Sequence, residues 1–168
     1  MAIQSFWWWH AVLIFVVANL LSGLPAGFSG DTAFYNSFRL PSVAPPDWLF
    51  PPMWLLLNIT SLVALHRVAN SPASGRRTRF LVAEAVGWVL FAVFATLYFW
   101  LQSPILAAID TVLYGLLTLV SVASCLGGDR IAALLIAPRL AWLALASYSG
   151  VYGAIYNTDP FFQSFLKP

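Results

Sequence analysis

Charged residues are scarce in this chain: Lys, Arg, Asp and Glu make up 8% of the 168 residues, whereas 61% are hydrophobic. A soluble domain of ordinary composition carries about 25% charged residues, so this chain lacks the polar surface that a water-facing globule needs. The few charges form neither a basic stripe nor a nucleic-acid-binding motif, so nucleic acid is not an expected partner. The composition predicts an integral membrane protein without a large soluble domain.

Cysteine and the usual catalytic combinations are also lacking. The single cysteine, Cys125, excludes an internal disulfide and a cysteine-based metal site. No carboxylate pair, Ser/His/Asp arrangement or glycine-rich phosphate loop occurs, and the two histidines have no further ligands at metal spacing. We therefore expect no catalytic residue, no metal site and no covalently bound cofactor.

Long apolar runs are what the chain does contain. Five of them can cross a bilayer as helices: 7–26, 48–65, 80–101, 104–126 and 131–156. The predicted fold class is all-α, a polytopic five-transmembrane-helix bundle in which residues 1–168 form a single domain. The connection between the first two runs is long and rich in aromatic residues and proline, so we expect an ordered loop with a short helix over 31–38.

The basic residues predict the orientation of the bundle. Five crossings put the N-terminus, the 2–3 loop and the 4–5 loop on one side, and the long 1–2 loop and the C-terminus on the other. The first side carries five arginines and the second two basic residues: Arg67, Arg76, Arg77, Arg79 and Arg130 against Arg39 and Lys167. By the positive-inside rule, the N-terminus and the 2–3 loop are cytoplasmic and the 1–2 loop lies on the opposite side.

Polar side chains inside the runs are costly in hydrocarbon, so each marks either a functional site or a hydrogen bond between helices. Asn19, Asn58 and Asp110 all lie roughly 9–15 Å from the outer ends of their helices, given the rise of 1.5 Å per residue. Trp54 and Phe94 fall in the same layer. This shared depth predicts a weakly polar aromatic cavity beneath the long loop; the alternative is hydrogen bonding that only holds the bundle together.

Two charged residues lie within the runs. Glu84 is about one turn inside the third run, where it can snorkel or pair with Arg77 or Arg79, and we interpret it as structural. Arg139 lies about 12 Å inside the fifth run and needs a partner or a route to the surface. Pairing of Arg139 with Glu84 across the bundle is one alternative.

The segment 34–54, which reads FYNSFRLPSVAPPDWLFPPMW, resembles the TspO/MBR family, also called translocator or tryptophan-rich sensory proteins. The segment 138–157, PRLAWLALASYSGVYGAIYN, is similar to the family's fifth helix, and Asp110 falls where the family places an aspartate. The resemblance implies five helices and a cavity, capped by the long loop, that binds porphyrins, sterols or isoquinoline-type ligands. The matching residues of the first segment are Phe34, Tyr35, Pro41, Pro45, Pro46 and Trp54.

The chain also departs from the family pattern. Val43 stands where a tryptophan is usual, Asn58 replaces an aromatic residue, and Arg139 replaces a tyrosine, while the third helix lacks the usual asparagine. We expect each change to affect a wall of the cavity. Sterol is disfavoured, because Tyr156 is followed by no basic residue before Lys167.

The leading hypothesis is a membrane protein that binds a planar hydrophobic ligand of the tetrapyrrole class in transport, sensing or regulation. The alternative is an accessory subunit of a larger membrane complex, for example a pigment–protein complex, with a vestigial cavity or one filled by lipid or pigment. An enzyme that degrades porphyrin is a weaker hypothesis, and homodimer formation stays open. The expected ligand-binding residues are Tyr35, Pro45, Trp54, Asn58, Phe94, Asp110, Trp142 and Ala146.

Overall fold

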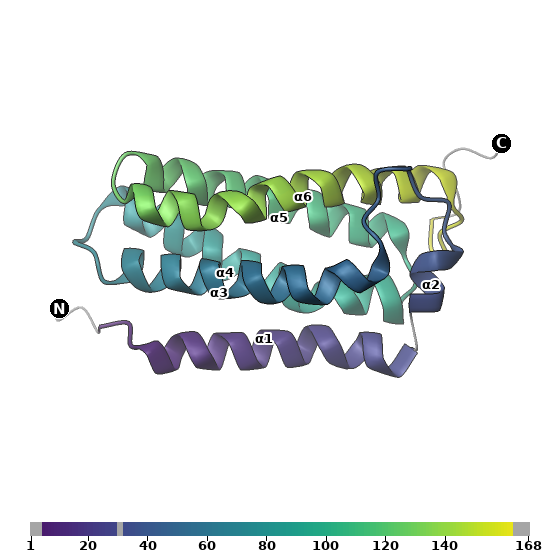
Figure 1. Cartoon of the computed structure of the whole chain (residues 1–168), viewed down its shortest axis with the longest axis horizontal. Coiled ribbons are helices and arrows are strands. Elements are labelled where there is room, and N and C mark those ends of the chain that lie inside the picture. The colour runs from purple at the N-terminus through teal and green to yellow at the C-terminus, as the bar shows by residue number, and fades with distance from the viewer. Residues whose placement is uncertain (1–4, 30–31, 163–168) are drawn as a thin grey trace.

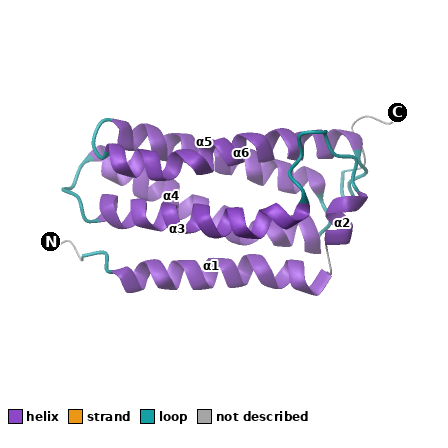
Figure 2. Cartoon of the chain, viewed as in Figure 1, coloured by secondary structure: helices purple, strands orange, loops and turns teal. Residues whose placement is uncertain are grey.

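The structure, a computed structural model, describes residues 5–29 and 32–162, which form helices joined by loops, with no strand in these ranges (Figure 2). Five stretches of the described chain are long and apolar enough to cross a membrane, which confirms the predicted all-α five-helix fold. The elements are α1 (Trp8–Ser29), α2 (Thr32–Ser37), η1 (Asp47–Leu49), α3 (Phe50–Ala69), α4 (Gly75–Ala95), η2 (Thr96–Trp100), α5 (Pro104–Leu126) and α6 (Arg130–Tyr156).

Two helices are longer than the sequence predicted, because each continues past its apolar run into basic residues. The second span reaches Ala69 rather than residue 65, and the third begins at Gly75 rather than at residue 80. The side chain of Ser74 caps α4 by accepting a hydrogen bond from the backbone N–H of Arg77 at 3.1 Å. Helical backbone therefore extends past the apolar run, because a cap and not hydropathy fixes where a helix begins.

The helices form a bundle with one peripheral member. α5 packs most extensively against α6 and then against α4, and α3 packs mainly against α6. α1 lies along the outside of the bundle and contacts chiefly α4, with smaller contacts to η2 and α3 (Figure 1). The α3–α4 and α5–α6 connections share one end of the bundle, and α2 lies at the other (Figure 1). Residues 32–46, which include α2, are called the cover segment below.

Two glycines allow close approach inside the bundle. A Cβ atom at Gly87 would lie 2.9 Å from the ring of Tyr114, and one at Gly150 would lie 3.5 Å from the backbone of Ala108. The small residues of α4 and α6 therefore serve packing within one chain, where they let α5 approach both neighbours.

A buried ion pair joins α4 to α6. The Nη2 of Arg139 donates to Oε1 of Glu84 at 2.5 Å, and both side chains are 1% exposed. Ser121 donates to the same carboxylate at 2.6 Å, and Arg139 also donates to Ser61 at 3.0 Å. The expected pairing of Glu84 with Arg77 or Arg79 is wrong: Arg77 instead donates to the backbone carbonyl of Ala69 at 2.7 Å.

Candidate ligand-binding cavity

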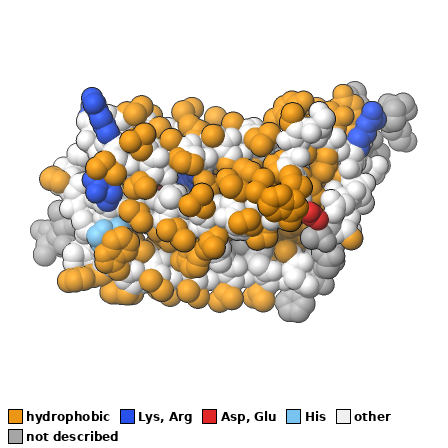
Figure 3. Space-filling model, in the orientation of Figure 1, with side chains coloured by type: hydrophobic (Ala, Val, Ile, Leu, Met, Phe, Trp, Pro, Cys, Tyr) orange, Lys and Arg blue, Asp and Glu red, His pale blue; other side chains and the backbone are white. Residues whose placement is uncertain are grey.

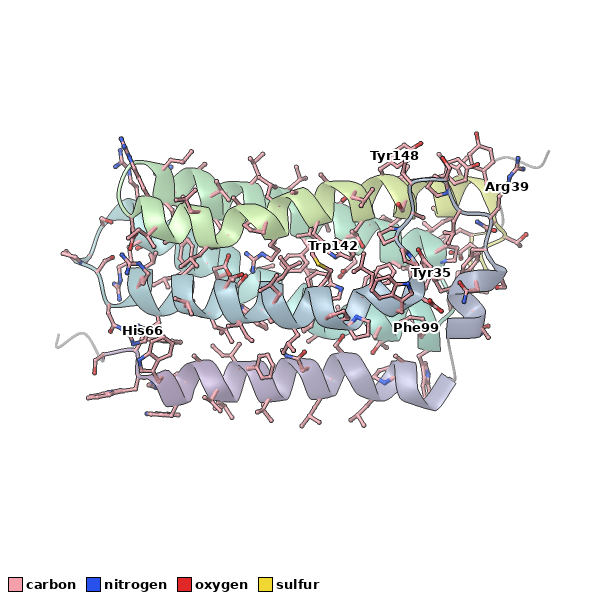
Figure 4. All side chains as sticks on the ribbon, in the orientation of Figure 1. Tyr35, Arg39, His66, Phe99, Trp142 and Tyr148 are labelled. Atoms are coloured by element: carbon pink, nitrogen blue, oxygen red, sulfur yellow. The ribbon has the colours of Figure 1, made fainter. Side chains whose placement is uncertain are left out.

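A cavity of about 550 Å³ lies at the α2 end of the bundle, between the helices and the cover segment. Its volume is within the range of pockets that hold small organic ligands. The walls come from α1, α3, α4, η2, α5 and α6, and eight aromatic side chains line it: Tyr35, Phe38, Phe50, Trp54, Phe91, Phe94, Tyr98 and Phe99. Figure 4 shows Tyr35 and Phe99 near this end and His66 at the opposite end.

The cover segment is closed on itself and attached to α6. The hydroxyl of Tyr35 donates to the backbone carbonyl of Pro45 at 2.6 Å, which links α2 to the extended half of the segment. Asn157, just after α6, accepts from the backbone N–H of Arg39 at 2.8 Å and donates to its carbonyl at 3.1 Å. Burial, and secondly the nearby charge of Asp47, raise the pKa of Tyr35 above its ordinary value, so Tyr35 stays a neutral donor.

A π-helical turn positions two of the lining aromatics. In η2 the backbone N–H of Leu101 donates to the carbonyl of Thr96 at 2.9 Å, so this turn is wider than that of an α-helix. Tyr98 and Phe99 lie in this turn and line the cavity. Tyr98 stacks on Phe94, with 5.7 Å between ring centroids and 12° between ring planes, which continues the aromatic wall from α4 into η2.

Trp54 connects the cavity to the polar interior. Its ring is parallel to that of Tyr114, with centroids 6.1 Å apart, and lies 5.1 Å from Phe91. The guanidinium of Arg139 lies 5.2 Å from the centroid of the same Tyr114 ring, within the range of a cation–π contact. The aromatic side of the cavity is thus packed against the buried ion pair.

The predicted site residues fall into two groups. Five of them line the cavity: Tyr35, Pro45, Trp54, Phe94 and Ala146. The other three, Asn58, Asp110 and Trp142, are buried but are not among its lining residues.

These three side chains pack between helices. Asn58 donates to Oδ1 of Asn19 at 3.3 Å, so it joins α3 to α1, and Asn19 itself lines the cavity. Asp110 is 4% exposed, and its Oδ2 has no hydrogen-bond partner among the described residues. Trp142 packs against Phe50 in a T-shaped arrangement, with ring centroids 5.5 Å apart and 75° between ring planes, and so contacts a lining residue.

Sequence reasoning missed several lining residues. Phe50 precedes Trp54 by four positions, and Phe91 and Tyr98 flank Phe94 at three- and four-residue spacing, so the helical period could have identified all three. Ser149 also lines the cavity, and its hydroxyl has no hydrogen-bond partner within the described ranges. A buried hydroxyl of this kind is a suitable contact for the polar edge of a ligand.

Comparison with known proteins identifies the family. The profile of the TspO/MBR family matches residues 11–152. The chain belongs to the TspO/MBR family. It is 32% identical over 139 residues to the tryptophan-rich protein TspO of Chlorobaculum tepidum, covering 74% of this chain and 84% of that protein.

Two further relatives are less similar in sequence. The tryptophan-rich protein TspO of Archaeoglobus fulgidus is 26% identical over 140 residues, covering 79% of this chain and 90% of the relative. The protein CrtK of Rhodobacter capsulatus is also 26% identical, over 141 residues, covering 79% of this chain and 84% of the relative.

Three of the departures from the TspO/MBR pattern lie outside the cavity wall, contrary to our expectation, whereas the missing asparagine of the third helix, near Gly87 or Phe91, falls at the wall because Phe91 lines the cavity. Val43 is 56% exposed on the cover segment, and Asn58 and Arg139 are buried between helices. None of the three is a lining residue of the cavity. Each replaces a family residue that is aromatic, and their polar or smaller side chains here serve the surface or the packing of the bundle.

Proposed function

We propose that this TspO-type membrane protein binds a planar hydrophobic ligand of the tetrapyrrole class in the cavity beneath the cover segment, in transport, sensing or regulation. The observation that carries the proposal is the wall of eight aromatic side chains around a cavity of about 550 Å³. Flat aromatic macrocycles gain from stacking and from burial of their large apolar faces.

The few polar groups of the cavity suit the edge of such a ligand. Asn19, Thr111 and Ser149 line the wall, and Asp47 lies at the edge nearest the cover segment. Three of these four have partners already: Asn19 bonds to Phe15 and Asn58, Thr111 donates to the carbonyl of Ala107, and Asp47 accepts from the side chain of Asn36. Ser149 is therefore the side chain that we propose contacts a polar substituent of the ligand.

Replacing Trp54 by Ala tests the proposal. Because Trp54 presents its ring to the cavity, Trp54→Ala should weaken porphyrin binding by about 1–3 kcal/mol while the fold persists. Binding is measured by quenching of the remaining tryptophan fluorescence in detergent solution. Trp100→Ala is the matched control, because Trp100 is 61% exposed and is not a lining residue. Equal porphyrin affinity in both variants and the parent would reject the site.

The alternative is an accessory subunit of a larger membrane complex, with lipid or pigment in the cavity. Purification in mild detergent, followed by mass spectrometry of everything that elutes with the chain, separates the two functions. The ligand-binding proposal expects the chain to elute without other polypeptides and to take up added porphyrin. Stoichiometric co-purification of other membrane polypeptides would favour the subunit.

We also propose an orientation for the integral membrane protein. Five arginines belong to the end of the bundle with the α3–α4 and α5–α6 connections, whereas Arg39 belongs to the cover segment at the opposite end. The positive-inside rule then makes the arginine-rich end cytoplasmic and the cavity end external or periplasmic.

A further inference from the structure

The end of the bundle away from the ligand cavity carries a second concave feature. A hollow of about 1020 Å³ opens between the 70–74 and 127–129 turns, and its walls are the ends of α3, α4, α5 and α6. Most of the Lys and Arg side chains visible in Figure 3 gather at this end. Five of the chain's eight basic residues line the hollow: Arg67, Arg76, Arg77, Arg79 and Arg130.

Three of these arginines are committed to the protein itself. Arg67 pairs with Asp129 at 2.9 Å, and this carboxylate also caps α6 by accepting from the backbone N–H of Ala132. Arg77 donates to the carbonyl of Ala69 at the end of α3, and Arg76 donates to the carbonyl of Gly127 just after α5. These contacts hold the walls of the hollow together, and Asp129, the one carboxylate among its lining residues, is already paired with Arg67.

The other two arginines have no such contact. Arg79 and Arg130 are exposed and line the hollow, and their side chains have no hydrogen bond or ion pair within the part of the chain that the structure describes. Five guanidinium groups against one carboxylate leave a formal excess of four positive charges around one concavity. Such a concentration of like charge is stabilised by a bound anion.

The position of the hollow favours one class of anion. It lies at the ends of four membrane-spanning helices, the level at which lipid phosphates meet the apolar core of a bilayer. Guanidinium groups bind phosphate oxygens through paired, charge-assisted hydrogen bonds. We infer that this hollow binds the phosphate of an anionic phospholipid headgroup, with Arg79 and Arg130 as the residues that contact it.

The inference is independent of the porphyrin proposal, because the two concavities share no lining residue. The test uses native mass spectrometry of the full chain in a neutral detergent, titrated with phosphatidylglycerol or with phosphatidylcholine. The parent should retain phosphatidylglycerol in preference to the zwitterionic lipid. The double variant Arg79→Gln/Arg130→Gln should lose about tenfold or more in phosphatidylglycerol affinity.

Arg39→Gln removes one positive charge from the cover segment at the opposite end, and it is the matched control for the single variants Arg79→Gln and Arg130→Gln. It should bind phosphatidylglycerol as the parent does. Two measurements on the parent need no variant: added salt should weaken retention of phosphatidylglycerol, and millimolar inorganic phosphate should compete poorly.

Three results would overturn the inference. The first is undiminished phosphatidylglycerol affinity in the double variant, and the second is an equal loss in Arg39→Gln and in the single variants, which would indicate attraction to net charge alone. The third is tight competition by inorganic phosphate, which would assign the hollow to a soluble phosphate compound.

Discussion

Arg139 and Glu84 show how a charge is accommodated inside an apolar bundle. Each is 1% exposed, and their contacts to each other, to Ser61 and to Ser121 replace the water that both ions lose. Transfer of either ion alone into a low-dielectric interior is strongly unfavourable, so the pair is stable only as a unit. Because Arg139 also lies against Tyr114, which stacks on Trp54, this unit supports one side of the cavity.

Removal of one partner should therefore cost more than removal of both. Arg139→Met leaves an unpaired buried carboxylate and should destabilise the fold by about 3–5 kcal/mol. The double variant Glu84→Leu/Arg139→Met leaves no buried charge and should recover most of this loss. Thermal unfolding of the purified variants in detergent measures both. If the double variant is as unstable as Arg139→Met alone, the pair does not act as the unit described here.

The sequence predicted least well which way each side chain faces around its helix axis. Depth along the helices predicted Trp54 and Phe94 in one layer, and both side chains line the cavity. Asp110 was predicted at the same depth but is buried without lining the cavity, because depth fixes only the position along a helix axis and the packing partners fix the rotation about it. Likewise, nothing in the sequence distinguished Arg139 from Arg77 or Arg79 as the partner of Glu84.

Among the elements, the cover segment depends on a small number of tethers. Asn157 makes two hydrogen bonds to the backbone of Arg39, and these are direct links between α6 and the extended half of the segment. Asn157→Ala removes both links, so backbone amides of residues 38–46 should exchange with deuterium faster, by about tenfold if the links contribute about 1.4 kcal/mol. Hydrogen–deuterium exchange with mass spectrometry measures this change.

Thr158→Ala is a matched control, because Thr158 is exposed and adjacent to Asn157. Its exchange in residues 38–46 should equal that of the parent. Unchanged exchange in Asn157→Ala would mean that other contacts hold the segment without the Asn157 tether, among them the Tyr35–Pro45 bond and the Arg39 guanidinium over the ring of Tyr156 in α6.

Asp159 ties the end of the described chain to the start of α5. Burial alone would raise the pKa of its carboxyl group, but hydrogen bonds from the hydroxyl of Ser103 and the backbone N–H groups of Phe161, Ile105 and Phe162 outweigh burial and lower it. A carboxyl whose pKa is lower in the folded state adds stability above its ordinary value of 3.8, and this stability is lost as the pH falls through the lowered value.

The variant Asp159→Asn should therefore show a pH-dependent loss of stability. At neutral pH it should be less stable than the parent by about 1–3 kcal/mol, because the charge-assisted hydrogen bonds are gone. Below the lowered pKa the parent is protonated as well, so the two unfolding free energies should converge. Chemical unfolding of both chains from pH 7 to acid measures the gap, and a constant gap would refute the assigned role.

Element ends show what hydropathy can and cannot predict. The five apolar runs identify the spans because each must be apolar where it crosses hydrocarbon. They underestimate α4 by five residues at its start, since Gly75–Ala95 includes the arginine-rich first turn that follows the Ser74 cap. Neither the π-helical turn of η2 nor its effect on Tyr98 and Phe99 has a hydropathy signature.

The whole molecule has two chemically different ends. One end holds the aromatic cavity and its cover segment, and the other holds the arginine-lined hollow. This asymmetry is the basis of the orientation proposed above, because the positive-inside rule expects basic loops to be retained in the cytoplasm while nearly neutral loops are translocated. Family membership, by contrast, fixes the fold and not this direction.

Single cysteines in the two ends test the direction. The background for both probes is Cys125→Ser, which removes the native cysteine, 2% exposed. A cysteine at the exposed position Ala73 then reports on the α3–α4 connection, and one at the exposed position Ser42 reports on the cover segment. A membrane-impermeant maleimide applied to intact bacterial cells should label the cysteine at position 42. The cysteine at position 73 should be labelled only after the cytoplasmic side is opened, because its loop carries the positive charges. Labelling in the reverse order would place the cavity towards the cytoplasm, and the charge bias would then not determine the topology of this bundle.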